Sequence, residues 1–87
     1  MIEFEFDTGK SLTNLNKHGI DFVQAQALWS DFNFLEVRAR SDDEPRFVVI
    51  GRIKDKHWSA VITYRDGRVR IISVRRSRQA EVELYES

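Results

Sequence analysis

Arginine is concentrated in the second half of the chain, where it alternates with apolar side chains. Residues 68–76 read RVRIISVRR, so basic residues are interleaved with β-branched ones. A strand with this pattern buries one face and displays cations on the other. Guanidinium groups held in this way can bind a polyanion, because each planar fork bridges two anionic oxygens and stays charged.

The charges are separated along the sequence, although the formal net charge is zero. Residues 1–44 contain nine acidic residues against four basic ones, and residues 45–78 contain two acidic residues against ten basic ones. The ten are Arg46, Arg52, Lys54, Lys56, Arg65, Arg68, Arg70, Arg75, Arg76 and Arg78. A basic face on a neutral chain indicates a polyanionic or acidic partner. The alternative is that these cations are solvated on the outer faces of ordinary strands.

The composition narrows the class of protein. A chain of 87 residues is long enough for one small domain, which we place at residues 1–87. The absence of cysteine excludes disulfides and thiolate metal sites, and two histidines disfavour a multi-histidine site, so we predict neither metal nor cofactor. The acidic start is unlike a signal peptide and no apolar run has membrane-spanning length, which predicts a cytoplasmic protein without a membrane partner.

The first third of the sequence predicts a strand followed by two helices. Residues 2–6 alternate apolar and acidic side chains, as a short edge strand does. A helix is expected over Asp7–His18, with Asp7 as its N-cap and Gly19 ending it in a left-handed conformation. Asp21 and Gln24 form the capping box of a second helix. The two helices are expected to form a hairpin with a very short connection.

The remainder predicts a sheet and a last helix. The apolar period changes to two, which indicates strands at 34–40, 46–54, 57–65 and 68–75. Gly51 suggests a bulge or a close backbone approach, Asp66-Gly67 is a hairpin turn, and Ser77 caps a terminal helix. The expected fold is α+β, a small antiparallel sheet with the order β-α-α-β-β-β-β-α.

Two groups of residues carry a resemblance to a known family. The first is Phe4-Glu5-Phe6-Asp7, Lys10, Asn14, Lys17-His18-Gly19-Ile20, Phe22 and Asp31. The second is Glu44, Arg46, Ile50-Gly51-Arg52, Tyr64, Arg70-Ile71-Ile72-Ser73-Val74-Arg75-Arg76, Glu81 and Tyr85. With these residues, the chain resembles the BrnT toxins over essentially its whole length. It departs from them at Phe6, where many members have tryptophan, and at Ser77, where alanine is usual.

The resemblance implies a ribonuclease of a type II toxin–antitoxin system with a RelE-like fold, which acts on RNA. It also implies a BrnA-like antitoxin with a ribbon-helix-helix domain, a hetero-oligomer with that antitoxin, and contact with operator DNA only through the antitoxin. Two other hypotheses stay open. One is a non-catalytic nucleic-acid-binding or co-repressor module, and the other is a structural partner whose basic face docks an acidic chain.

A metal-independent ribonuclease of this kind lets the ribose 2′-hydroxyl attack the adjacent phosphate, while cations stabilise the added charge and a base and an acid handle the protons. We predict these residues to be catalytic: Arg52, His57, Tyr64 and Arg75. We predict these to bind RNA: Arg65, Arg70 and Arg76. Arginine is expected to matter more than histidine, because the chain offers a surplus of arginines and one histidine of ambiguous placement.

Structural alternatives accompany these assignments. His57 could be an exposed turn histidine, Tyr64 a half-buried sheet residue, and Arg75 a partner of Glu81 that supports the terminal helix. Strict alternation would place Arg70 and Arg75 on opposite faces of the last strand. The RNA-binding face is expected on the strands and not on the N-terminal helices.

Overall fold

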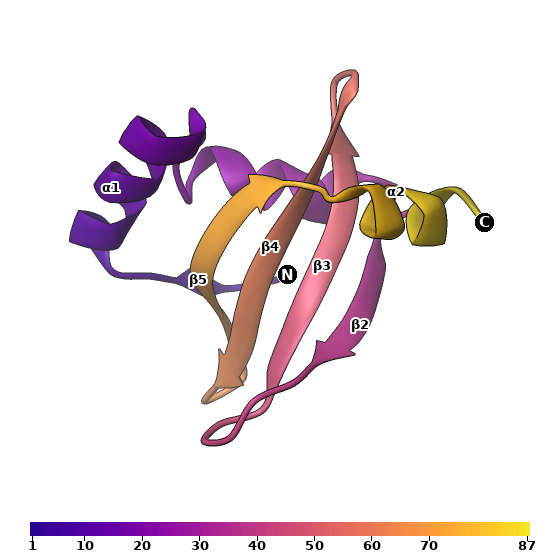
Figure 1. Cartoon of the computed structure of the whole chain (residues 1–87). Helices are drawn as coiled ribbons and strands as arrows, with labels where there is room; N and C mark the ends of the chain where they lie inside the picture. Colours follow the sequence, from indigo (N-terminus) through magenta and orange to yellow (C-terminus); the bar gives the residue numbers. More distant parts are fainter.

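Five strands form one sheet with helices on both of its faces, in a computed structural model that describes residues 1–87 (Figure 1). The elements are β1 (Phe4–Glu5), α1 (Thr8–His18), the 3-10 helix η1 (Gln24–Ser30), β2 (Leu35–Ala39), β3 (Arg46–Ile53), β4 (Lys56–Arg65), β5 (Arg68–Arg76) and α2 (Gln79–Glu86). The strand order is β1-β5-β4-β3-β2. The predicted α+β class is confirmed.

The sheet is mixed, so the prediction of a purely antiparallel sheet was wrong. Strands β2 to β5 pair antiparallel through consecutive hairpin connections, but β1 pairs parallel with β5. The amide of Val69 donates to the carbonyl of Glu3 at 2.9 Å across this junction. A parallel pair needs a long crossover between its strands, and all the chain between β1 and β5 supplies one.

Helix α1 begins and ends as predicted. The Asp7 carboxylate accepts a hydrogen bond from the Lys10 amide at 2.9 Å, which caps the N-terminus. Gly19 ends the helix with a φ of 80°, and its amide donates to the Leu15 carbonyl at 2.9 Å. Glycine adopts this left-handed conformation without the penalty that a β-carbon imposes.

The second helical segment is a 3-10 helix, so the predicted hairpin of two α-helices does not form. The Asp21–Gln24 capping box is present, with bonds of 2.7 and 2.9 Å. The residues buried by this helix and the turn before it are Phe22, Ala25 and Leu28, which recur at every third position. That spacing aligns them on one face of a helix with three residues per turn, whereas an α-helix would rotate them apart.

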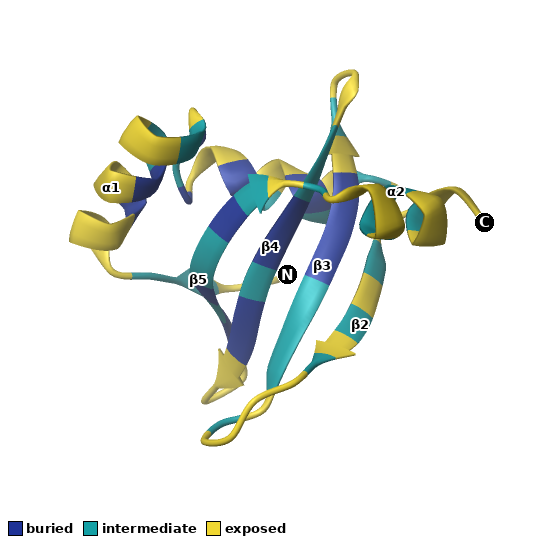
Figure 2. Cartoon of the chain, viewed as in Figure 1, coloured by how far each residue is buried: buried dark blue, intermediate teal, exposed yellow.

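The core lies between the sheet and the two N-terminal helices. Helix α1 packs on β5 and η1 packs on β3, so we call the covered side the inner face. Its buried side chains are Ile20, Phe22, Ala25, Leu28, Val49, Ala60, Ile62, Val69, Ile71 and Val74. Buried Asn14 links α1 to β5, because its amide donates to the Val74 carbonyl at 2.9 Å and accepts from the Val74 amide at 3.1 Å. Figure 2 shows that α1 turns its exposed side away from the sheet.

A bulge in the sheet changes the faces that the arginines of β5 occupy. The pairing of β4 with β5 shifts at Val61/Ile62 and leaves Ile72 as an extra residue on β5. The β4 residues opposite Arg70 and Arg75 are an even number of positions apart, so both arginines lie on the outer face. The prediction of opposite faces, which assumed strict alternation, was therefore wrong.

Helix α2 lies on the outer face, at the end of the sheet where β5 finishes (Figure 1). Its N-cap is Arg78, whose amide donates to Glu81 at 2.8 Å, and not Ser77 as predicted. The Ser77 hydroxyl instead bonds the hydroxyl of Ser59 at 2.8 Å, which takes it away from the helix. None of the α2 residues is fully buried. No helix of the chain combines the length and the apolarity needed to cross a membrane.

Candidate functional site

Two of the predicted catalytic residues meet at the end of the sheet that carries the Lys54-Asp55 turn, which we call the β3–β4 end. Arg52 and His57 are opposite each other in the pairing of β3 with β4. Side chains of directly opposed residues share a face and lie close together. Both lie on the outer face, where α2 contributes its last turn to the same cluster.

His57 is oriented by two residues of α2. Its Nε2 atom is 2.8 Å from a carboxylate oxygen of Glu86, and its ring lies edge-on to Tyr85 with 5.2 Å between ring centroids. The side chain is 20% exposed, so it is not the freely solvated turn histidine of the structural alternative. With Nε2 engaged by Glu86, Nδ1 is the nitrogen left to exchange a proton.

Asp31 joins η1, β3 and α2 at a single carboxylate. Its Oδ2 atom accepts from the Tyr85 hydroxyl at 2.7 Å and from the Arg52 amide at 2.7 Å, and Oδ1 accepts from the Asn33 amide at 2.9 Å. Burial opposes ionisation of Asp31, but these hydrogen bonds outweigh it and lower its pKa. The same bond to Asp31 is the main reason that the pKa of Tyr85 rises to about 12. The carboxylate therefore stays charged and the phenol stays protonated.

Gly51 allows Asp31 to approach β3. A β-carbon at this position would lie 3.0 Å from the Leu28 side chain and 3.3 Å from the Asp31 carboxylate. The close backbone approach predicted for this strand glycine is confirmed. Any larger side chain would push η1 and the carboxylate away from Arg52.

Arg75 is occupied by an ion pair within the fold. Its two terminal nitrogens donate to the two carboxylate oxygens of Glu81 at 2.7 and 2.8 Å, and Ser59 adds a hydroxyl bond of 2.9 Å to the same carboxylate. The hydrogen bonds from Arg75 lower the pKa of Glu81 to about 2, and the pKa of Arg75 is raised in turn. The structural alternative for Arg75, a partner of Glu81 that holds α2, is confirmed.

Three further predicted residues lie away from this cluster and are paired with acids. Tyr64 donates to Glu36 at 2.5 Å, and it is seven positions along β4 from His57, about 23 Å at the usual rise per residue. The other two contacts are Arg65 with Glu44 at 3.5 Å and Arg70 with Glu5 at 2.9 Å. The structure therefore does not bring Tyr64, Arg65 and Arg70 together with Arg52 and His57.

Arg76, the last predicted residue, is at the β3–β4 end but on the inner face. It forms no salt bridge, and its guanidinium carbon lies 5.6 Å from the centre of the Trp58 ring. Sequence reasoning gave no role to Asp31 or Glu86, which orient Tyr85 and His57 here. The family resemblance included Asp31 without assigning it a role, and nothing in the local sequence marks Glu86.

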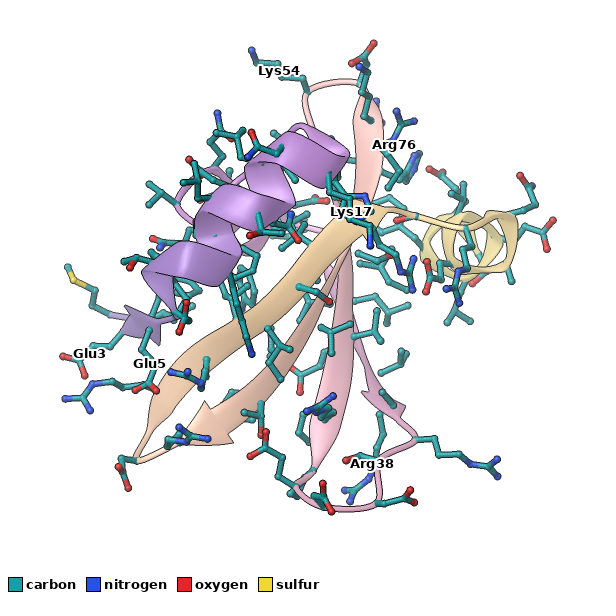
Figure 3. All side chains as sticks on the ribbon, turned by 60° about the vertical axis from the view of Figure 1, so that its left-hand side comes forward. Glu3, Glu5, Lys17, Arg38, Lys54 and Arg76 are labelled. Atoms are coloured by element: carbon teal, nitrogen blue, oxygen red, sulfur yellow. The ribbon has the colours of Figure 1, made fainter.

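Four cations without a salt bridge lie at this end of the molecule, although others, such as Arg38 at the far end of β2, are also unpaired. No salt bridge involves Arg52, Lys54, Lys56 or Arg76, whereas Glu44, Glu3 and Glu5 neutralise the arginines at the far ends of β3 and β5. Figure 3 shows Lys17, Lys54 and Arg76 in the upper part of the molecule and Glu3 and Glu5 in the lower part. The β3–β4 end thus combines a free arginine, an oriented histidine and an excess of positive charge.

No group of three or more His, Cys, Asp or Glu side chains is arranged to hold a metal ion.

Comparisons with known proteins agree with the sequence resemblance. No curated protein matches the chain. The family model described as the ribonuclease toxin BrnT of a type II toxin–antitoxin system matches residues 6–81. Since that match covers most of the 87 residues, the chain belongs to the BrnT family of ribonuclease toxins.

Proposed function

We propose that this chain cleaves RNA at the β3–β4 end, as the toxin of a type II toxin–antitoxin pair. The observation that supports the proposal is the juxtaposition of Arg52 with His57, next to cations that no acid neutralises. RNA supplies the polyanion that such a surface attracts. We leave Arg75 out of the phosphate-binding set, because both of its terminal nitrogens donate to Glu81.

The arrangement suits attack of a ribose 2′-hydroxyl on the neighbouring phosphorus. His57 accepts the hydroxyl proton at Nδ1, and Glu86 stabilises the imidazolium that forms through its contact with Nε2. Arg52 binds the non-bridging oxygens and offsets the charge that builds up on the phosphorane. The P–O5′ bond breaks, the leaving oxygen takes a proton from water, the hydroxide that results takes the proton from the His57 imidazolium, and a 2′,3′-cyclic phosphate remains. Arg52 and His57 together support a cleavage reaction that does not need a metal ion.

Membership of the family supports a proposal for the partner and for the finer fold assignment. A type II system pairs its toxin with a protein antitoxin. We infer that this antitoxin is BrnA-like with a ribbon-helix-helix domain, that the two proteins form a hetero-oligomer, and that the fold is RelE-like. The β-hairpins of β3, β4 and β5 packed against N-terminal helices support the last inference.

Cleavage of a labelled RNA by the purified chain tests the proposal. Arg52→Ala is expected to lower the cleavage rate on the order of a hundredfold or more, because it removes the charge that stabilises the transition state. The substitution should leave the fold intact, since only the backbone amide of Arg52 bonds Asp31. Arg68→Ala is the matched control: it removes an exposed arginine that is paired with Glu3 at the far end of the sheet and should leave the rate unchanged.

His57→Ala, assayed in the same way, tests the ranking of arginine above histidine. Circular dichroism must show that each variant is folded. If Arg52→Ala cleaves normally and His57→Ala is inactive, the histidine dominates and the ranking is inverted. If the wild-type chain binds RNA but never cuts it, the chain is a non-catalytic nucleic-acid-binding module.

A further inference from the structure

A hollow of about 400 Å³ lies on the inner face of the β3–β4 end, on the opposite side of the sheet from His57. Its walls come from the β3–β4 turn and from the segment that links α1 to η1. The residues important here are Gln24, Lys54, Asp55, Lys56 and Trp58. The volume is in the range of about 300–1,000 Å³ that is typical of sites for small ligands.

The walls of the hollow combine an aromatic ring with cations. Trp58 is half-buried, and its ring carries the Arg76 guanidinium at 5.6 Å. Lys54 and Lys56 are exposed and form no salt bridge. Aromatic rings that stack with bases, next to cations that contact the backbone, are the features by which proteins bind single-stranded nucleic acid.

The walls also offer hydrogen-bonding groups that the fold leaves free. Gln24 uses its Oε1 atom to accept from the Asp21 amide, but its side-chain NH₂ group has no partner within the protein. The Asp55 carboxylate forms neither a salt bridge nor a hydrogen bond. A free donor and a free acceptor beside an aromatic ring are suited to the polar edge of a nucleobase.

Lys54 adopts a backbone conformation that its side chain does not favour. Its φ is 59°, a left-handed value that glycine or asparagine would adopt at less cost at the tip of a hairpin. The turn Asp66-Gly67 at the other end of β4 uses the residue types that suit positive φ. The fold alone therefore gives no reason for lysine at position 54, whereas a phosphate contact would.

We propose that the hollow is a subsite for one base and its phosphate of single-stranded RNA, at a nucleotide that flanks the bond to be cut. This inference rests on the proposed cleavage at Arg52 and His57. Successive residues of β4 point to opposite faces, so Trp58 lies directly beside His57 along the chain but on the other side of the sheet. An RNA strand that passes over the β3–β4 end contacts both sites, and the hollow selects among sequences at the flanking position.

Fluorescence of Trp58 tests the subsite without relying on cleavage. Trp29→Phe leaves Trp58 as the only tryptophan, and a short 2′-O-methyl oligonucleotide serves as the probe because it lacks the attacking hydroxyl. Titration is expected to quench the emission to saturation. Replacing the flanking base by an abasic residue should weaken binding on the order of tenfold, because stacking is lost.

Substitutions at the turn provide the matched comparison. Lys54→Gly combined with Lys56→Gln removes two charges while relieving the positive φ of residue 54, and it should weaken binding on the order of tenfold without lowering the melting temperature. Lys10→Gln removes one charge near the start of α1 and should have no effect.

The outcomes separate this inference from the proposed function. Quenching without cleavage of natural RNA supports the subsite and contradicts the cleavage proposal. Cleavage without quenching, or quenching that is indifferent to the abasic residue, overturns the subsite alone. Equal quenching by an acidic peptide, with the same dependence on Lys54 and Lys56, would show that the hollow docks a protein and would also overturn it.

Discussion

At the scale of single residues, the surroundings decide the role of an arginine. Arg52 and Arg75 lie on the same face of the same end of the sheet, and both were predicted from the sequence to be catalytic. Glu81 binds both terminal nitrogens of Arg75, while no carboxylate pairs with the side chain of Arg52. The difference arises from α2, which begins three residues after β5 ends at Arg76 and brings Glu81 to Arg75, and only the folded geometry shows it.

The Arg75–Glu81 pair predicts how stability responds to acid. The folded-state pKa of Glu81 is about 2, below its ordinary value of 4.5. A lowered carboxyl pKa contributes stability that is present above pH 4.5 and is lost as the pH falls through about 2. We expect this pair to contribute roughly 2 kcal/mol to the free energy of unfolding near neutral pH.

Arg75→Met should remove that contribution, and urea unfolding monitored by circular dichroism at several pH values between neutral and acid measures it. The variant should be less stable than the wild type near neutral pH and should lose less stability on acidification. An identical acid dependence in the two proteins would show that the ion pair is not the cause.

At the scale of elements, α2 is held to the sheet by polar contacts. No residue of α2 is fully buried, and Glu81, Tyr85 and Glu86 each bond a partner outside the helix. Such contacts are individually modest, so α2 is expected to open more readily than the strands beneath it. Since Tyr85 and Glu86 also position the Asp31 and His57 side chains, the integrity of α2 and that of the candidate site are linked.

Removing one hydroxyl tests this dependence. Tyr85→Phe deletes the bond to Asp31 and should speed amide hydrogen exchange throughout α2, with a destabilisation of about 1 kcal/mol. Tyr64→Phe is the matched control, because it deletes a tyrosine–carboxylate bond at the opposite end of β4. Exchange in α2 should stay unchanged in that control. Equal exchange in the wild type and Tyr85→Phe would mean that other contacts hold the helix.

The elements also show which parts of the fold the sequence could predict. Most signals that depend on neighbouring residues were correct: the Asp7 cap, the left-handed Gly19 and the Asp66-Gly67 turn all appear as expected, whereas the predicted Ser77 cap was wrong. Features that depend on distant partners were not predictable. The bulge at Ile72 depends on how β5 pairs with β4. The parallel pairing of β1 depends on β5, which comes more than 60 residues later in the chain.

For the candidate site too, the residue types could be predicted from the sequence, but the contacts between distant residues could not. The sequence proposed Arg52 and His57 from their residue types, since arginine binds phosphate and histidine transfers protons, and their catalytic roles stay predictions. It could not show that Arg52 and His57 are neighbours or that Tyr64, which it also proposed, lies at the opposite end of β4. The contact between Asp31 and Tyr85 joins residues 54 positions apart, and no local pattern encodes such a pair.

At the scale of the whole molecule, positive charge is unevenly neutralised. Salt bridges pair Arg46, Arg65, Arg68 and Arg70 at the far end of the sheet, whereas Arg52, Lys54, Lys56 and Arg76 at the β3–β4 end form none. The electrostatic potential of the neutral chain is therefore uneven along the sheet, and it favours binding of a polyanion at the β3–β4 end. This agrees with the expectation that RNA binds the strands and not the N-terminal helices, which stays a prediction.

RNA binding should accordingly weaken steeply with salt. The affinity of the chain for single-stranded RNA is expected to fall on the order of tenfold between about 50 and 200 mM salt, because bound phosphates release counterions. Lys56→Gln should reduce the slope of the log–log salt plot by about 0.7. Arg68→Gln, which removes an arginine already paired with Glu3, should leave the slope unchanged. If the slope changed only in Arg68→Gln, RNA would bind at the end of the sheet opposite the β3–β4 end, which would contradict the prediction.

The core of the molecule is thin, and this predicts a strong response to the antitoxin. Only 16 of 87 residues are buried, and large apolar side chains remain exposed, among them Ile2, Phe32 and Phe34. A small domain without disulfides has limited stability of its own, and a partner that binds only the folded state adds to it by mass action. An excess of antitoxin about a hundredfold above its Kd contributes about 2.7 kcal/mol, which should raise the melting temperature by roughly 10 °C or more.

Thermal unfolding of the chain with and without its cognate antitoxin measures this shift. The antitoxin must be melted alone as a control, so that its own transition can be subtracted. An unchanged melting temperature at saturating antitoxin would mean that the partner does not bind the folded toxin selectively. Neutralisation would then have to act through the RNA or through the unfolded chain, because linkage requires a partner that prefers the folded state to stabilise it.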